Sequence, residues 1–121
     1  MSRSVIYFLC VIAVVGLGYF GGDLVFPDTS PALSNELQAG EKLYAAHCAS
    51  CHPNGGNTIN PAIPVLGSAQ LKDPNTFTRF CRNPLRPDGS KGIMLAFSKD
   101  KLSDKELLQL YKYITRGLAG K

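Results

Sequence analysis

The residues with the most specific chemistry form one short run, Cys48-Ala-Ser-Cys51-His52. On a helix, two cysteines three residues apart share a face, so both thiols can add to the two vinyl groups along one porphyrin edge. His52 comes next and can present an imidazole to the iron of the same ring. C-x-x-C-H is the attachment pattern of a c-type haem. The run therefore predicts one haem c, bound through Cys48 and Cys51, with His52 as an axial ligand.

Two other interpretations of this run require residues that the sequence does not supply. A redox C-x-x-C is typical of a βαβ context, whereas no segment of this chain has the two-residue period of a strand. A structural zinc site needs a second ligand pair at metal spacing. Cys10 and Cys81 are single, and His47 is the only other histidine. We expect Cys10 to be an apolar filler and Cys81 to be a buried free thiol, with linkage to a partner as its alternative.

The N-terminal segment predicts a membrane anchor. The chain has 121 residues, enough for one small domain and an appendage. Residues 5–22 carry no charge, a length that suits a membrane-spanning helix. Arg3 favours a cytoplasmic N-terminus and export of the chain beyond the apolar segment. We predict an uncleaved anchor over residues 1–26, a linker over residues 27–33 and a haem domain over residues 34–121, with a cleaved signal peptide as the alternative.

Helices and loops account for the rest of the chain. A first helix is expected to begin near Ser34 and to reach Cys48. A second is expected to take Asp73 as its N-cap and to end at residues 83–84, an Asn-Pro pair.

The last helix has the strongest local signals. Ser103 and Glu106 have the spacing of a capping box, and Leu102 and Leu107 that of the accompanying hydrophobic staple. Gly117 is a natural stop. Together these patterns predict an all-α haem domain.

Residues 34–118 resemble class I cytochromes c, in particular the short photosynthetic and bacterial monohaem type. The attachment run ends an N-terminal helix, and Met94-Leu-Ala-Phe97 is similar to the family's M-P-A-F ligand loop. Pro64-Val-Leu66-Gly67 stands where the family has a proline and a leucine after the haem histidine. Asn54-Gly-Gly-Asn57 is similar to the short photosynthetic cytochromes, among them a membrane-tethered cyanobacterial type called cytochrome M.

The resemblance implies a class I cytochrome c fold of three to five helices around a covalent haem, preceded by one transmembrane helix. It implies Met94 as the second axial ligand, and Met1 is the only other methionine. It also implies that the second ring N–H of His52 donates to the Pro64 carbonyl, since metal-bound imidazoles are usually oriented in this way.

The candidate haem wall is apolar and consists of Leu66, Phe77, Phe80 and Phe97. The family's crossing of N- and C-terminal helices corresponds here to Gly40 and Tyr44 on one side and Leu110 and Tyr113 on the other. Gly40 inside a helix costs about 1 kcal/mol relative to alanine, so it is expected to allow a close approach of the last helix.

Charge and ligation indicate how such a domain works. Histidine and methionine together close both axial positions and raise the iron's potential, which suits electron transfer rather than an enzyme. The net charge is +4, and residues 72–101 hold seven basic side chains against three acidic ones. A solvated face is one interpretation; a docking patch for an acidic partner is the other. The patch would consist of Arg79, Arg82, Arg86, Lys91 and Lys99.

We therefore expect a membrane-anchored cytochrome that passes single electrons between membrane redox complexes on the periplasmic or thylakoid-lumenal side. No nucleic-acid-binding pattern is present. Two alternatives stay open. One is a fixed haem subunit of a respiratory or photosynthetic complex, and the other is a haem sensor or peroxidase in which Met94 is displaceable.

Overall fold

Three α-helices make up the frame of the domain in the structure, a computed structural model that describes residues 30–121. They are α2 (Pro31–His47), α3 (Pro74–Arg82) and α4 (Asp104–Lys112), and α4 continues as a π-helical segment, η3 (Tyr113–Leu118). Short 3-10 turns lie at Pro53–Gly55 and Ala69–Leu71. Within residues 30–121, strand-like pairing is limited to one bridge between Leu85 and Lys91. The described part is therefore all-α, as predicted.

The predicted membrane anchor over residues 1–26 lies outside the described residues. Among residues 30–121, no helix combines the length and the apolar character needed to cross a bilayer.

Helix α2 begins earlier than the sequence predicted. Pro31 is its first residue, and the Ser30 hydroxyl accepts a hydrogen bond from Leu33 N at 3.4 Å. Proline is well suited to this position, because its ring presets the helical φ and its missing N–H would have had no partner there. The predicted start at Ser34 is therefore wrong by three residues.

The predicted starts of α3 and α4 are confirmed. Asp73 caps α3 by accepting from Thr76 N at 2.8 Å, and the helix ends at Arg82. Ser103 and Glu106 form the complete capping box of α4: Ser103 N donates to Glu106 Oε2 at 2.7 Å, and Glu106 N donates to the Ser103 hydroxyl at 3.3 Å.

The predicted stop at Gly117 is one residue early, because η3 runs through it to Leu118. A Cβ at Gly117 would lie 2.8 Å from Cδ2 of Tyr113. The missing side chain therefore makes room for the tyrosine ring and does not end the helix.

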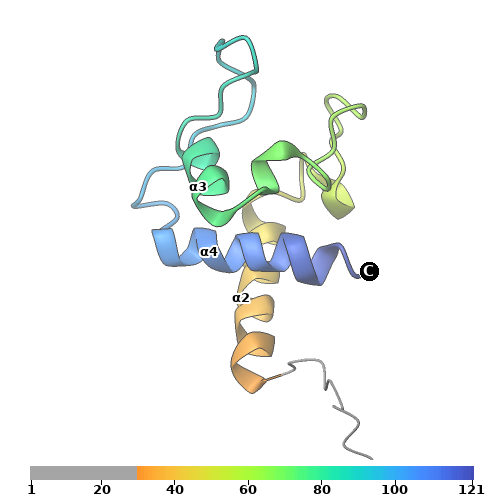
Figure 1. Cartoon of the computed structure of the whole chain (residues 1–121), viewed down its shortest axis with the longest axis vertical. Helices are drawn as coiled ribbons and strands as arrows, with labels where there is room; N and C mark the ends of the chain where they lie inside the picture. The colour runs from red at the N-terminus through yellow and green to blue at the C-terminus, as the bar shows by residue number, and fades with distance from the viewer. Residues whose placement is uncertain (1–29) are drawn as a thin grey trace, which may run out of the picture.

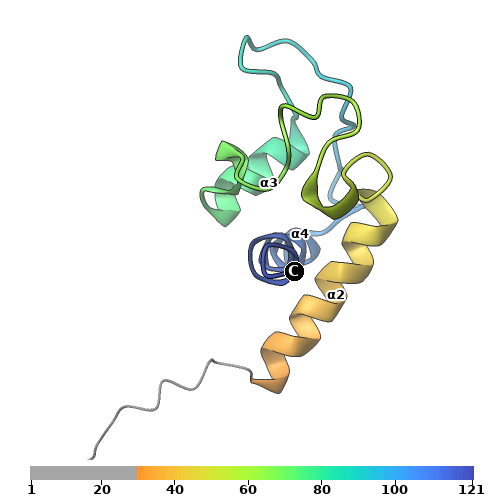
Figure 2. The ribbon, with the colours of Figure 1, turned by 90° about the vertical axis from the view of Figure 1, so that its right-hand side faces the viewer.

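Helices α2 and α4 cross, and Figure 2 shows α4 end-on beside α2 (Figures 1 and 2). At the crossing, a Cβ on Gly40 would lie 2.3 Å from Gln109 O and 2.6 Å from the Tyr113 Cβ. The Tyr44 and Tyr113 rings pack with their centroids 5.6 Å apart. The predicted close approach at Gly40 is thus confirmed.

The core lies between these helices and the loops above them. Its buried side chains come from the three α-helices, from η3 and from the turn before α4: Tyr44, Phe77, Cys81, Leu102, Leu107, Leu110, Tyr113 and Ile114. The two long loops, residues 56–68 and 83–98, rise on the side of the molecule to which the C-terminal end of α2 points (Figure 1).

Candidate haem site

The attachment residues lie in the turn that comes directly after α2. Cys48 N donates to Tyr44 O at 2.9 Å, and Cys51 N and His52 N both donate to Cys48 O, at 3.1 and 2.8 Å. The chain thus keeps a helix-like course through both cysteines. Cys48 is half-buried and packs against the core, whereas Cys51 is exposed.

The imidazole of His52 has a fixed orientation. Its Nδ1 lies 3.0 Å from Gly56 O. A carbonyl oxygen only accepts, so Nδ1 carries the hydrogen and the lone pair lies on Nε2, ready for a metal. Gly56 O, and not the predicted Pro64 carbonyl, is the partner of the ring in this structure, because the chain turns back sharply at Pro53–Gly55 and brings Gly56 O to the ring.

Tyr44 ties the histidine to the loop behind it. Its hydroxyl donates to His52 O and accepts from Gly55 N at 3.0 Å. Gly55 has φ +79°, and a Cβ there would lie 2.5 Å from Cγ of Leu66. Gly55 O in turn accepts from Val65 N and Leu66 N at 2.9 and 3.0 Å. Glycine is needed here both for its backbone angle and for the contact with Leu66.

Met94 lies on the loop between α3 and α4 and is half-buried. With Cys48, Leu66 and Phe97, it belongs to the partly buried side chains that pack against the core. The structure therefore places Cys48 and Met94 against the same core, whereas Cys51 is exposed.

The four predicted wall residues occupy different environments. Phe77 is a core residue with 6% exposure, and Leu66 and Phe97 pack against the core. Phe80 is half-buried and lines a shallow groove of about 1000 Å³ between α3 and the start of α4.

Two further side chains near the site are placed by the structure. The His47 ring stands edge-on to Phe97, with the centroids 5.9 Å apart. Cys81 is a free thiol with 2% exposure, as predicted, and burial raises its pKa to about 12. Burial likewise raises the pKa of the Cys48 thiol to about 11.

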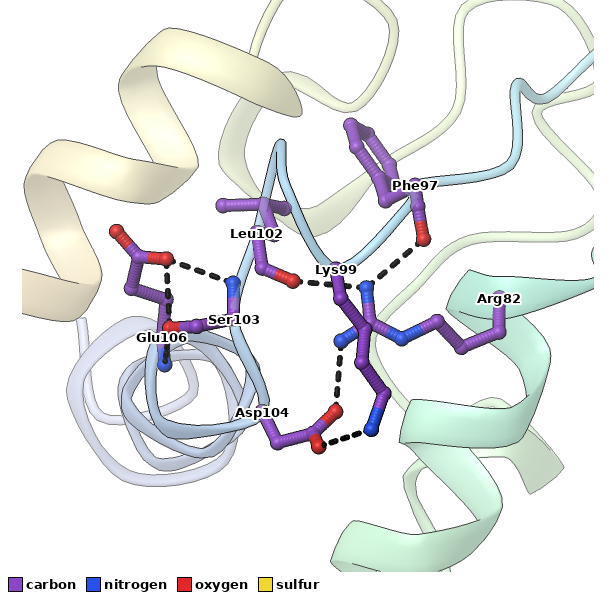
Figure 3. Close-up of polar contacts among 7 residues, drawn as sticks. All are labelled: Arg82, Phe97, Lys99, Leu102, Ser103, Asp104 and Glu106. Carbon is purple, nitrogen blue, oxygen red and sulfur yellow. Dashed lines mark hydrogen bonds and ion pairs between the residues drawn. The ribbon is translucent and has the colours of Figure 1, made fainter.

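The basic residues around Met94 are not equivalent. Arg82 is turned inward: its guanidinium donates to Phe97 O and Leu102 O and pairs with Asp104 (Figure 3). The exposed ammonium of Lys99 pairs with the same carboxylate at 2.9 Å. No sequence pattern indicates this arrangement, because the partners of Arg82 lie 15 to 22 residues away along the chain.

The residues present fit a covalently bound haem. Two thiols lie on one turn, one against the core and one exposed; an imidazole has its Nε2 left for iron; and a thioether is half-buried over the same core. Such a donor set on a small helical domain defines a c-type haem protein.

Comparison with known proteins agrees with this class. The family described as "Cytochrome C oxidase, cbb3-type, subunit III" matches residues 35–114. The chain belongs to this cytochrome c family and is a small class I monohaem cytochrome c that carries haem c covalently. It is accordingly a protein of the electron-transfer class and not an enzyme.

Three similar proteins are of cyanobacterial origin. The chain is 30% identical over 103 residues to a cytochrome c6 of Synechocystis sp., covering 85% of this chain and 82% of that one. It is 29% identical over 87 residues to the photosystem II extrinsic protein V of Gloeobacter violaceus, covering 67% and 48%. The crystal structure of the PsbV2 cytochrome from Thermosynechococcus elongatus superposes with a TM-score of 0.63 at 26% identity, covering 71% and 72%. The chain spans about half the length of some curated relatives that it matches.

Proposed function

We propose that this protein carries single electrons between redox complexes at the outer face of a membrane, through one haem bound by Cys48 and Cys51. His52 and Met94 are its axial ligands, and residues 1–26 anchor it in the membrane. When bound, the haem supplies a one-electron couple. The chain's own residues hold that group and exclude other chemistry by closing both axial positions.

One observation carries the proposal: the His52 Nδ1 is bonded to Gly56 O, so that the lone pair of the ring lies on Nε2. The turn that sets this orientation is itself held by Tyr44 and Leu66. A preset imidazole of this kind supports permanent ligation to iron. The half-buried Met94, which packs against the same core as Cys48, supports a second ligand from the chain.

The partner surface is proposed to be acidic. Arg86 and Lys91 are exposed on the turn that leads to Met94, and neither has an ion pair among the described residues. Arg79 is also exposed and bonds only to Thr76, at 3.3 Å. These three cations form the docking patch that we retain. Two predicted members are left out: Arg82, whose side chain is only 20% exposed and bonds internally, and Lys99, which pairs with Asp104.

The absorption spectrum of the purified protein, made in a host that attaches haem, tests cofactor and ligation together. We expect thioether-linked haem bands and, in the oxidised state, the weak Met–iron charge-transfer band. Met94→Ala is expected to keep the haem and lose that band. Rapid carbon monoxide binding by the ferrous wild type would instead favour a sensor with a displaceable Met94.

A second candidate function is a fixed haem subunit of a photosynthetic complex. It is favoured by the likeness to a photosystem II extrinsic protein, although the chain covers only 48% of that relative. Mild detergent extraction and subsequent sizing separate the two functions. A lone small haem protein supports the carrier, and a stable large complex supports the subunit.

A further inference from the structure

The segment that presents Met94 is fastened at its two ends. Before it, Arg86 N donates to Ser90 O at 2.8 Å beside the bridge from Leu85 to Lys91. Between the bridge and Phe97, the backbone of residues 93–96 makes no hydrogen bond within the described part of the chain. The position of Met94 therefore depends on the packing of its side chain against the core and on how firmly the two ends of the segment are held.

Phe97 is the fixed point at the C-terminal end. Its N–H donates to Cys81 O at 2.9 Å, and its carbonyl accepts from Nη1 of Arg82 at 2.8 Å. Both contacts come from the last turn of α3. Phe97 is only three residues from Met94, so a shift of this fixed point is passed directly to the thioether.

The guanidinium of Arg82 joins three parts of the fold at once (Figure 3). Besides Phe97 O, Nη1 donates to Leu102 O at 2.7 Å, and Nη2 donates to Asp104 at 2.7 Å. It thus links the end of α3, the Met94 loop and the start of α4. Bonds from a charged donor are shorter and stronger than neutral ones, and this side chain is only 20% exposed. Lysine cannot reproduce the set, because one ammonium does not reach two carbonyls and a carboxylate in the same planar fork.

We propose that Arg82 is a positioning residue for Met94: by clasping Phe97 to Leu102 and Asp104, it holds the ligand loop closed over the haem. The inference rests on the proposed ligation by Met94. Loop opening removes the thioether from the iron, and the population of the open loop depends on the contacts at its two ends. Loss of the charged hydrogen bonds of Arg82 is expected to raise that population on the order of tenfold to a hundredfold.

The test compares three variants of the haem-loaded full chain with the wild type. Arg82→Gln removes the clasp. Lys42→Gln removes the same charge from an exposed position on α2, away from the loop contacts. Tyr111→Phe removes the hydrogen bond from the Tyr111 hydroxyl to Leu71 O at 3.2 Å, which is not among the contacts of Arg82. The readouts are the rate of carbon monoxide binding to ferrous protein, the temperature at which the ferric charge-transfer band disappears, and the free energy of unfolding.

Arg82→Gln is expected to bind carbon monoxide roughly tenfold or more faster and to lose the band at lower temperature. Lys42→Gln is expected to match the wild type, and Tyr111→Phe to lose stability while keeping the wild-type carbon monoxide rate. Equal carbon monoxide rates in Arg82→Gln and the wild type, or a parallel increase in Tyr111→Phe, would overturn the inference.

Further results separate the clasp from the ligation on which it depends. If Arg82→Gln does not fold, Arg82→Lys takes its place; an increased carbon monoxide rate supports the clasp, and an unchanged rate overturns it. A wild type that lacks the Met–iron band overturns the proposed ligation and the inference with it. A wild-type band that persists unchanged in the Arg82 variants overturns the inference alone.

Discussion

At the scale of single residues, the Tyr44 hydroxyl makes two hydrogen bonds that support the attachment turn. It donates to His52 O and accepts from Gly55 N, so one oxygen joins the end of the attachment run to the turn behind the imidazole. Tyr44 is 4% exposed, and its two partners are also joined directly by a longer bond from Gly55 N to His52 O at 3.2 Å. Burial is also the first cause that raises the pKa of this phenol, so the hydroxyl keeps its hydrogen at neutral pH.

Tyr44→Phe keeps the ring and removes both hydrogen bonds. Because two hydrogen bonds are lost and the buried Gly55 N–H keeps only its 3.2 Å bond to His52 O, the free energy of unfolding of the holo protein is expected to fall by about 1–3 kcal/mol. Denaturant unfolding monitored by circular dichroism measures the loss, and the visible spectrum reports the histidine environment.

Tyr111→Phe is the matched control for that change. Its hydroxyl donates to Leu71 O at 3.2 Å, outside the attachment turn. It is expected to lose on the order of 1 kcal/mol and to leave the haem spectrum unchanged. A Tyr44→Phe protein as stable as the wild type would contradict the role given to this hydroxyl.

Site residues can be predicted from sequence where the chemistry of haem attachment fixes their spacing. Hydrogen-bond partners that depend on the tertiary fold are harder to predict. The Cys48–His52 run predicts haem attachment from its residue types and spacing, and the single internal methionine is the only thioether candidate for the iron. The acceptor for the His52 ring was predicted at Pro64 and lies at Gly56, because the local turn with Asn54 at φ 51° decides which carbonyl comes nearest.

At the scale of elements, the contact of α2 with α4 depends on Gly40. A methyl group there would lie 2.3 Å from the backbone oxygen of Gln109, which cannot move without shifting α4. The helix-forming preference of alanine over glycine is worth about 1 kcal/mol. Overpacking of a close contact costs about 1–3 kcal/mol, so the clash is expected to exceed the gain.

Gly40→Ala is therefore expected to lower the free energy of unfolding by up to about 2 kcal/mol net. Thermal or urea unfolding of the holo protein measures it. Gln38→Ala, an exposed change on the same helix, controls for helix preference and is expected to change stability by less than about 0.5 kcal/mol. An increase in stability for Gly40→Ala would show that the helices separate at no cost.

Helix starts were predictable because their signals are local. Asp73, Ser103 and Glu106 each bond within three residues, so the cap can be seen in the sequence itself. The start of α2 was missed because Ser30 and Ser34 both suit the N-cap, and the advantage of proline at the first position decides between them. The clasp of Arg82 was missed because its partners become neighbours only through the tertiary fold.

At the scale of the whole molecule, carboxylates at helix starts link stability to pH. Hydrogen bonds from Arg82 and then Lys99 hold the pKa of Asp104 below its usual 3.8. A hydrogen bond from Thr76 does the same for Asp73, and the backbone N–H of Ser103 lowers the pKa of Glu106. A pKa lowered by folding means that the unfolded chain binds more protons near pH 4. The stabilisation is therefore complete above the ordinary carboxyl pKa and is lost as pH falls through the lowered folded values.

The urea midpoint is thus expected to fall as pH decreases from about 5 to about 3. Asp104→Asn is expected to be less stable at pH 7, to show a shallower decrease, and to approach the wild type in acid. Asp100→Asn removes the same charge from an exposed carboxylate that has no hydrogen bond among the described residues. Parallel pH profiles for Asp104→Asn and the wild type would contradict the linkage.

Charge on the whole molecule also bears on how electrons reach it. The net charge is +4, and Arg86 and Lys91 stand on a turn pinned by the bond from Arg86 N to Ser90 O, close in sequence to Met94. A positive potential at this surface attracts anionic reagents and repels cationic ones, and salt weakens both effects. The rates at which small charged oxidants react can therefore report the electrostatic potential of this surface without knowledge of the natural partner.

Oxidation of the ferrous protein by ferricyanide is expected to slow by up to about tenfold between low and moderate salt, whereas oxidation by a cationic cobalt complex is expected to accelerate. Arg86→Gln with Lys91→Gln is expected to flatten both salt dependences. Lys42→Gln with Lys105→Gln removes the same charge from exposed positions on α2 and α4. This control is expected to retain more of the salt dependence of both oxidation rates. Equal slopes for the two double variants would mean that only total charge matters, and that the turn before Met94 has no special part in docking.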